Sequence, residues 1–458
     1  MNTIKKMGFW SIVLLTINSI IGTGIFLSPG SVAKIAGSWA PVIYLCAGIF
    51  AAILAISFAS ASKYVNKSGA AYAYAKTAFG DNVGLYVGIT RFVAASIAWG
   101  VMATAVVKTV LNIFKLDQSN LVFITIGFLA LMAILLIVNL FGTKVLTRIS
   151  DLSTIGKLAA LIIFVVAGVV VLIVTGANNF AQINTVTNAS GETLASTMNT
   201  QVFVAALISA FYAYTGFESV ASGASDMESP EKNLPRAIPI GIALVAAVYC
   251  SIVLVSMMLN PVALVTSTEV VVLASVFNNP IVSALVVLGA LISMFGINVA
   301  ASFHTPRILE AMAQENQFPS FFAKREKNGF PLRAFLLTAI IAIVVPMAFQ
   351  YNMGSIMVIS SISRFVQFII VPCAVIFFFF GMSKEKTLDA KKNGLTDVVI
   401  PLVSLGLTVL LLTQFDWVGN FSIATESGQT ANYFAIAAMV VGYVVLPLLA
   451  FIYKKVSK

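Results

Sequence analysis

The sequence predicts an all-α integral membrane protein of about 12 transmembrane helices, with broken helices 1 and 6, a 5+5 inverted repeat and two extra C-terminal helices. Three observations lead to this fold: the composition, a series of apolar segments of bilayer length, and glycine–threonine interruptions in the first and sixth segments. The chain has 458 residues, of which 59% are hydrophobic and 10% charged, and its mean hydropathy is +0.99. Soluble proteins carry roughly 25% charged residues, so this composition indicates a lipid environment.

The apolar segments follow one another along the whole chain. A membrane-spanning helix needs about 20 apolar residues. By this measure the chain holds twelve candidate spans: 9–36, 40–62, 84–112, 120–140, 151–175, 201–224, 236–259, 280–313, 333–350, 354–382, 397–414 and 431–453. We therefore expect a single polytopic domain over residues 1–458. Between the spans, 63–83 is expected to form a short amphipathic or re-entrant element, and 260–279 a short helix on the outer face.

The positive charges indicate how the spans are oriented. Most of the 27 lysines and arginines fall in the segments that are cytoplasmic when the N-terminus is inside. The exceptions are Lys34, Lys108 and Lys115 in outer segments, and Arg91, Lys157, Arg307 and Arg364 within or at the ends of spans. Positive residues favour the cytoplasmic side, so both termini are expected in the cytoplasm, with the chain in the cell membrane. The net charge of +10 is thus a topology signal, and we expect no nucleic-acid partner.

The first span contains the stretch from Ser19 to Gly30, SIIGTGIFLSPG, with two glycines around a threonine at mid-depth. Glycine costs about 1 kcal/mol in a helix interior relative to alanine, so the helix is expected to open there. Opened backbone in a membrane is tolerated where it faces protein or a wet cavity. Two interpretations follow: half of a binding site, or a close-packing patch of small residues.

The sixth span carries a matching interruption. It reads FYAYTGFES from Phe211 to Ser219, again with a Thr-Gly pair. Interrupted helices in corresponding positions of two halves point to a transporter site. The halves would be repeat one, about 9–175, and repeat two, about 201–382, followed by extra helices at about 397–453. Five spans is an odd number, so the second repeat enters the membrane from the opposite side and the two breaks meet near the midplane.

Two such breaks suit a zwitterion. Amide groups of Thr23, Gly24 and Ile25, at the positive end of a half-helix, attract a carboxylate. Carbonyls near Ile20 and in the sixth-span break can bind an ammonium group. The candidate substrate-binding residues are Ile20, Ile21, Gly22, Thr23, Gly24, Ile25, Tyr212, Ala213, Thr215 and Gly216.

These motifs resemble those of the amino acid–polyamine–organocation (APC) transporters. The first-span and sixth-span stretches match that family's patterns. SPEKNLPRAI, from Ser229 to Ile238, resembles its "NP.R.LP.AI" inner loop with Ser in place of the usual Asn, and TPRILEAMA, from Thr305 to Ala313, resembles its "RILYAMA" end of span 8. The resemblance covers all twelve spans. It implies the LeuT-type fold and amino-acid substrates.

Lys157 lies near the start of span 5, in TIGKLAA. From the residues alone a lysine that snorkels to the inner interface is favoured. The resemblance implies a different role, in which the ammonium of a span-5 lysine replaces the Na⁺ that sodium-coupled relatives hold between spans 1 and 8. Lysine changes its protonation readily when desolvated, so Lys157 would serve either proton coupling or a sodium-independent exchanger. Ser302 and Tyr249 are candidate neighbours of Lys157.

Glu218 is the other ionisable group at depth in these motifs. Intramembrane acids are functional candidates by default, and the resemblance implies that an acid here is linked to proton sensing in some members. The alternative is a hydrogen bond that stabilises the break. Its neighbour Phe217 is included as a coupling or gating residue. Arg91 and Arg364 are interface or gating candidates, for which a purely structural role is favoured.

The leading functional hypothesis is a secondary amino-acid transporter, either a proton-coupled symporter or an exchanger. A polyamine or amine–amino acid antiporter would require more carboxylates in the pocket. A membrane enzyme would require an acid/base or metal cluster, and one histidine, three separated cysteines and scattered acids do not provide it. The sequence lacks the P-loop G-x-x-x-x-G-K-[ST], which argues against an ATPase. No cofactor or metal is expected, and a non-transporting amino-acid sensor on the same fold stays open.

Overall fold

The computed structural model describes residues 7–65, 69–141, 143–187, 193, 197–220, 227–267, 269–326, 329–425 and 428–456, and nearly all of these are helical. The first half holds α1 (Phe9–Ile20), α2 (Gly24–Ala36), η1 (Gly37–Trp39), α3 (Ala40–Tyr64), α4 (Ala71–Phe79), α5 (Asp81–Ile113), α6 (Leu121–Leu140), α7 (Thr143–Thr175) and η2 (Phe180–Thr185). The middle of the chain holds α8 (Thr200–Phe211), η3 (Tyr212–Tyr214), α9 (Phe217–Val220), α10 (Pro230–Leu259), α11 (Pro261–Thr266), η5 (Val272–Val276) and α12 (Pro280–Gln314). The remainder holds η6 (Ser320–Ala323), α13 (Leu332–Ala348), α14 (Met353–Ile362), α15 (Phe365–Phe380), η7 (Leu395–Val399), α16 (Ile400–Thr413), α17 (Trp417–Asn420), β1 (Ser422–Thr425), β2 (Gly428–Ala431), α18 (Tyr433–Val440), η8 (Val441–Val445) and α19 (Leu446–Val456).

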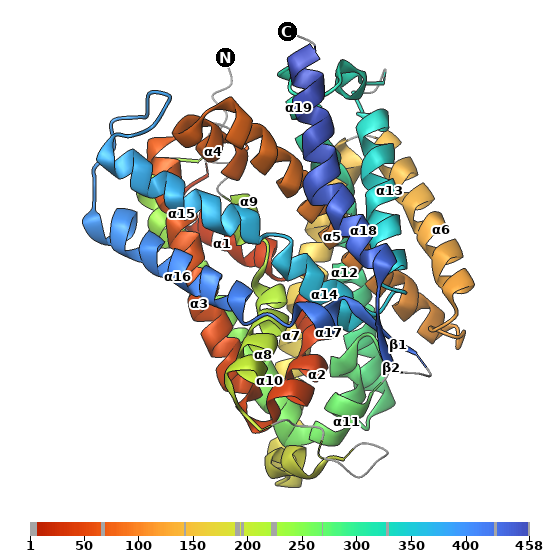
Figure 1. The fold of residues 1–458 in the computed structure, drawn as a ribbon. Helices are drawn as coiled ribbons and strands as arrows, with labels where there is room; N and C mark the ends of the chain where they lie inside the picture. Colours follow the sequence, from red (N-terminus) through yellow and green to blue (C-terminus); the bar gives the residue numbers. More distant parts are fainter. Residues whose placement is uncertain are drawn as a thin grey trace.

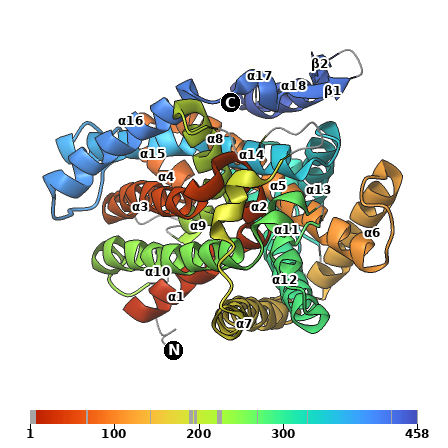
Figure 2. The same cartoon turned by 90° about the horizontal axis from the view of Figure 1, so that it is seen from below.

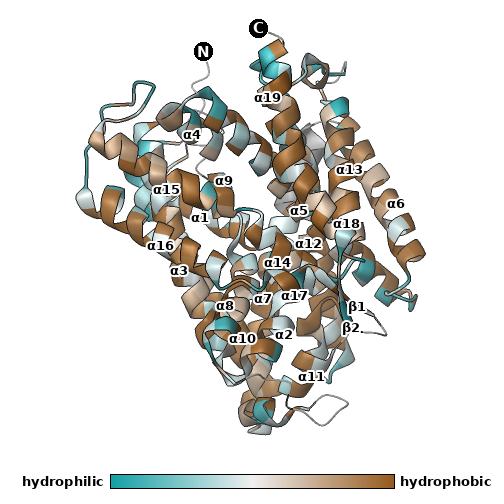
Figure 3. Ribbon diagram, viewed as in Figure 1, coloured by the Kyte–Doolittle hydropathy of each residue, from teal (hydrophilic) through white to brown (hydrophobic). Residues whose placement is uncertain are grey.

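The all-α membrane architecture predicted from the sequence is confirmed. In the described residues, 10 helical segments are long and apolar enough to cross a membrane, and Phe9–Ile20 and Leu332–Ala348 are shorter apolar helices. Together they overlap all twelve predicted spans; residues 221–224, at the end of the predicted sixth span, lie outside the described residues. Hydrophobic residues predominate along the helices of the bundle (Figure 3), and many large apolar side chains are exposed on its outside. Ile173 and Val174, for example, are 76% and 79% exposed, as expected of side chains that face lipid.

The bundle has two distinguishable ends. The chain begins and finishes at one of them, beside α4, and we call this the terminal end; α11 marks the opposite, distal end (Figure 1). Seen along the bundle, α2, α5, α8 and α14 lie centrally, whereas α6, α7, α16 and α18 lie at the periphery (Figure 2). The two short elements expected between spans are present as α4 and α11.

Asparagine side chains begin many of the helices. The Oδ1 of Asn279 accepts from the amides of Ile281 and Val282, at 2.9 and 3.3 Å, just before Pro280. This satisfies amide groups that have no acceptor within the helix. The same side-chain cap starts five further helices, at Asn120, Asn199, Asn260, Asn352 and Asn432. Each capped start fixes where a helix enters the bundle.

Small residues let α7 and α12 pack closely. A Cβ added to Gly156 would lie 2.5 Å from Ile292, and Gly289 and Gly296 approach Ala160 and Ser153 closely enough that a side chain would overlap them. Close backbone approach replaces the hydrophobic driving force that is weak between helices in lipid. The consequence for function is that α7, which carries Lys157, is held in a fixed register against α12.

A buried ion pair attaches α16 to α3. Asp397, which is 0% exposed, accepts from Lys63 Nζ at 2.6 Å and from Tyr64 Oη at 2.7 Å. The backbone amide of Asn393 and the hydroxyl of Thr396 also donate to this carboxylate, at 3.0 and 2.8 Å. The π-helical turn η7 carries Asp397. Beyond α16, the chain forms the short helix α17 and the antiparallel strands β1 and β2.

Asp397→Ala should destabilise the bundle. It leaves the Lys63 ammonium buried without its carboxylate, and breaking such a pair costs about 3–5 kcal/mol. Thermal unfolding of the purified protein in detergent measures the loss. Asp416→Ala is the control, because that exposed residue only caps α17 and its loss should cost about 1 kcal/mol. Equal stability of the two variants would contradict the role of the pair.

Candidate functional site

The first span is interrupted where the sequence predicted. α1 ends at Ile20, Ile21 is extended with φ −68° and ψ 100°, and α2 begins at Gly24. The stretch from Ile20 to Gly30 is buried. The first amides of α2 have no acceptor within their own helix, and the positive end of its dipole lies at the same point. The break therefore offers an anion a set of donors.

The sixth span is interrupted in the same manner. α8 ends at Phe211, the single turn η3 follows, and α9 begins at Phe217. Thr215 folds back, with its amide and its hydroxyl donating to the Tyr212 carbonyl at 3.3 and 2.8 Å. Gly216 has φ +121°, a conformation that favours glycine. This explains the Thr-Gly pair in the sequence.

The two breaks touch each other. A Cβ added to Gly24 would lie 2.5 Å from the Cα of Ala213, and one added to Gly216 would overlap the carbonyl oxygen of Ser19. Between these contacts the hydroxyls of Thr23 and Tyr212 are 3.1 Å apart. The glycines thus provide both an interruption and a close-packing surface. The close-packing interpretation of the first-span stretch is confirmed, and the binding-site interpretation stays a prediction.

Lys157 lies against the first break. Its Nζ donates to the carbonyls of Asn18 and Ile21 at 2.7 and 2.8 Å, and the residue is 5% exposed. One turn earlier, Thr154 donates to the Asn18 side chain at 3.0 Å. The ammonium does not reach solvent at a helix end, so the snorkelling interpretation favoured by the residues alone is wrong. The lysine instead compensates carbonyls that the end of α1 leaves without helical donors.

Glu218 joins the second break to span 10. Its Oε2 accepts the Gly216 amide at 2.8 Å, and its Oε1 forms an ion pair with Arg364 Nη1. Span 10, predicted as one helix over 354–382, is in fact interrupted, because α14 ends at Ile362 and α15 begins at Phe365. Arg364 occupies that interruption. The sequence offered one signal for it, the polar run Ser360-Ser361-Ile362-Ser363-Arg364 inside an apolar segment.

Ser302 and Tyr249, the two candidate neighbours of Lys157, are placed elsewhere. The hydroxyl of Ser302 accepts from the side chain of Asn139 at 2.8 Å, on α6. Tyr249 donates to the Ala213 carbonyl at 3.2 Å, so it supports the sixth-span break. Their positions around the helix axis explain the difference, since sequence spacing alone does not show which face of a span meets which neighbour.

Phe217 packs on the terminal-end side of the sixth-span break. Its ring stacks on Phe368 of α15 with centroids 5.9 Å apart and meets Phe58 of α3 edge-on at 6.0 Å. Arg91 lies on α5 and donates to the Gly69 carbonyl. Aromatic rings and the Glu218–Arg364 pair therefore lie on the terminal-end side of the sixth-span break, the side on which α4 lies.

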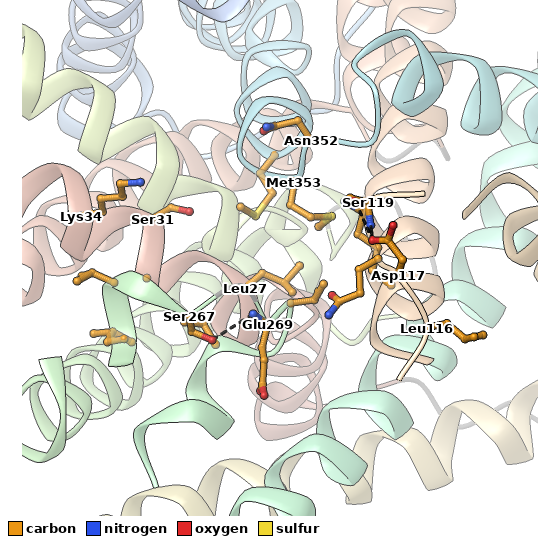
Figure 4. A pocket seen from close by; sticks show the side chains of 18 residues that line it. Leu27, Ser31, Lys34, Leu116, Asp117, Ser119, Ser267, Glu269, Asn352 and Met353 are labelled. Carbon is orange, nitrogen blue, oxygen red and sulfur yellow. Dashed lines mark hydrogen bonds between the residues drawn. The ribbon is translucent and has the colours of Figure 1, made fainter. Parts of the chain in front are cut away.

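A cavity of about 630 Å³ lies on the other side, at the distal end. Figure 4 shows it between α2, the loop before α6, the α11–η5 segment and the start of α14. Its charged lining residues are Lys34, Lys108, Asp117 and Glu269. Hydrogen bonds from the hydroxyl and amide of Ser119 hold the pKa of Asp117 below its ordinary value. Leu27 lines the cavity and lies one turn beyond Gly24. The first break is therefore next to the cavity, on its terminal-end side.

Within the described ranges, groups of three or more His, Cys, Asp or Glu side chains that would hold an ion are absent.

Comparison with known proteins gives a consistent result. The family model described as amino acid permease matches residues 7–446. An uncharacterized transporter of Mycobacterium tuberculosis is 40% identical over 464 residues, covering 98% of this chain and 95% of its own. The methylthioribose transporter of Bacillus subtilis is 24% identical over 420 residues, covering 88% and 87%. The serine/threonine exchanger SteT of Bacillus subtilis is 27% identical over 333 residues, covering 71% and 72%.

Gly216→Ala should separate the two breaks. The new Cβ would overlap the Ser19 carbonyl at a positive φ, which combines overpacking with backbone strain and should cost at least about 2 kcal/mol. Thermal unfolding in detergent measures the loss. Gly406→Ala is the matched control, because its Cβ meets nothing within 4 Å on α16. A Gly216→Ala variant as stable as the control would contradict the close approach.

Proposed function

This chain belongs to the amino acid permease family, and we propose that it is a secondary active transporter of amino acids that works by alternating access without sodium. It is a multi-pass membrane transporter. The proposal adds the cell membrane as its location, cytoplasmic termini, the 5+5 inverted repeat over 9–175 and 201–382, and either proton-coupled symport or amino-acid exchange. No catalytic reaction is part of it.

The paired breaks support an amino-acid substrate. The first amides of α2 attract a carboxylate, and the carbonyls of the neighbouring sixth-span break attract an ammonium group. Both features belong to the protein backbone, and their ligands would be the carboxylate and ammonium groups that all amino acids share. The contacts Gly24–Ala213 and Ser19–Gly216 run in opposite directions along the two spans, as an inverted repeat requires.

The position of Lys157 is the observation that supports the sodium-independent mechanism. Its ammonium group donates hydrogen bonds to the carbonyls of Asn18 and Ile21. Backbone carbonyls at the end of a half-helix are the groups that coordinate Na⁺ or H⁺ in transporters with broken helices. An ammonium group that is covalently part of the chain takes the place of an exchangeable ion here, and it connects span 5 to the break.

The distal cavity supports a route for the substrate. It has a polar lining that includes charges of both signs, and it reaches to within one turn of the first break. Substrate entering from this side would meet Leu27 and Met357 before the break. Opening toward the opposite side would require the aromatic and ionic contacts of Phe217 and Glu218 to separate.

Uptake by proteoliposomes tests the substrate and the ion together. We expect counterflow of at least one neutral amino acid from a panel of the twenty amino acids, putrescine and methylthioribose, at a rate that is unchanged when choline replaces Na⁺. Exchange of putrescine would favour the amine antiporter. Binding without counterflow would favour the sensor, and a strict sodium requirement would contradict the role of Lys157.

Lys157→Met should reduce uptake by more than about tenfold. The change leaves two buried carbonyls without their charged donor, an interaction worth about 1.5–3 kcal/mol, and so disturbs the first break. Initial rates per unit of reconstituted protein measure the effect. Lys392→Met is the matched control, since that exposed lysine donates to the Phe379 carbonyl away from both breaks. Wild-type rates for Lys157→Met would exclude the lysine from the mechanism.

A further inference from the structure

Arg364 is a buried cation whose place the proposed mechanism does not yet explain. It follows Ser363 in the interruption between α14 and α15, and its side chain is 12% exposed. Within the described part of the chain its Nε has no hydrogen-bond partner. The guanidinium is held through Nη1, by its ion pair with Glu218.

The two oxygens of Glu218 serve different partners. Oε1 pairs with Arg364, and Oε2 accepts the Gly216 amide at 2.8 Å. Gly216 is the residue that touches the Ser19 carbonyl and has a positive φ. Through this acid, the interruption in span 10 is connected to the peptide at which spans 1 and 6 meet.

The C-terminal helices support the same interruption. Tyr443, in the π-helical turn η8, donates to the Ser363 carbonyl at 2.6 Å. A π-turn displaces side chains from ordinary helical register and is frequent at functional sites. Span 12 thus holds the backbone carbonyl directly before Arg364.

We propose that Arg364 is a positioning residue, which holds the Glu218 carboxylate on the Gly216 amide and so fixes the shape of the sixth-span half of the substrate site. The proposal rests on the function proposed above and deepens it. It assigns Glu218 as an acceptor for a backbone amide and a guanidinium, which is the hydrogen-bond alternative raised by its sequence position. It also gives the extra C-terminal helices a role, since Tyr443 holds the interruption that presents Arg364.

Hydrogen–deuterium exchange of the full-length protein in nanodiscs tests this without any substrate. The readout is the peptide covering 212–220, which contains the Gly216 amide. Arg364→Met should raise exchange there by about tenfold or more, because a hydrogen bond to a charged acceptor is lost. Arg364→Lys keeps a cation beside Glu218, although it lacks the fork geometry of the guanidinium. Hydrogen–deuterium exchange of the same peptide should therefore stay within about threefold of the wild-type rate.

Two further variants separate positioning from general stability. Lys63→Met removes the cation of the other buried pair, with Asp397, and should leave exchange of 212–220 unchanged. The charge exchange E218R/R364E keeps an ion pair but places the carboxylate at the span-10 interruption, away from the Gly216 amide. Hydrogen–deuterium exchange of the peptide 212–220 in this variant should stay above the wild-type rate, even when the variant reaches the membrane in wild-type amounts. If Arg364→Met fails to reach the membrane, Arg364→Lys and E218R/R364E still test the positioning role of Arg364.

Transport adds a second, independent measurement. Uptake of L-[³H]threonine by E218R/R364E should show KM raised by about tenfold, the effect of losing one charged hydrogen bond, with kcat less affected. Wild-type exchange at 212–220 in both Arg364→Met and E218R/R364E, or wild-type KM in E218R/R364E, would overturn the proposal. Failure of the wild-type protein to take up L-threonine bears on the substrate alone, because the exchange measurement does not depend on it.

Discussion

Backbone groups that leave a helix inside a membrane must find partners within the protein, and the arrangement of this bundle depends on how that requirement is met at two places. The end of α1 is compensated by the ammonium of Lys157. The sixth-span break is compensated by Glu218 at the Gly216 amide and by Tyr249 at the Ala213 carbonyl. In each case the compensating side chain reaches a group that helical hydrogen bonds do not satisfy.

This compensation makes the broken helices stable only as parts of the assembled bundle. Lys157 comes from α7, which α12 holds in register through small residues. Arg364, which secures Glu218, comes from the span-10 interruption that Tyr443 braces. The close approach of Gly24 to Ala213 then leaves little room for the breaks to shift independently. We infer that a change at one break is transmitted to the other through direct contact.

The sequence was sufficient to predict the membrane class, the twelve spans and both principal breaks, because glycine and composition act locally. It also identified Lys157 as a residue of interest, although the residues alone favoured the wrong position for its ammonium. Span 10 was predicted as continuous because its interruption lacks glycine or proline and is held by contacts with Glu218 and Tyr443. Ser302 and Tyr249 were assigned to the wrong neighbourhood because hydropathy does not give the rotation of a helix about its axis.

In the function proposed above, recognition of a substrate has two parts. Backbone groups of the breaks would bind the carboxylate and ammonium of any amino acid, and discrimination between side chains would be left to other residues. Two proteins that this chain resembles are named for serine and threonine and for methylthioribose, so similarity to this chain does not by itself identify one cargo. The cavity beside Leu27 and Met357 lies on the distal side of the breaks, and the Phe217 stack and the Glu218–Arg364 pair lie on the other. For a transporter that binds its substrate at the breaks, as proposed above, this conformation would place side-chain selection and access on the distal side, while the contacts on the terminal side hold the breaks in shape.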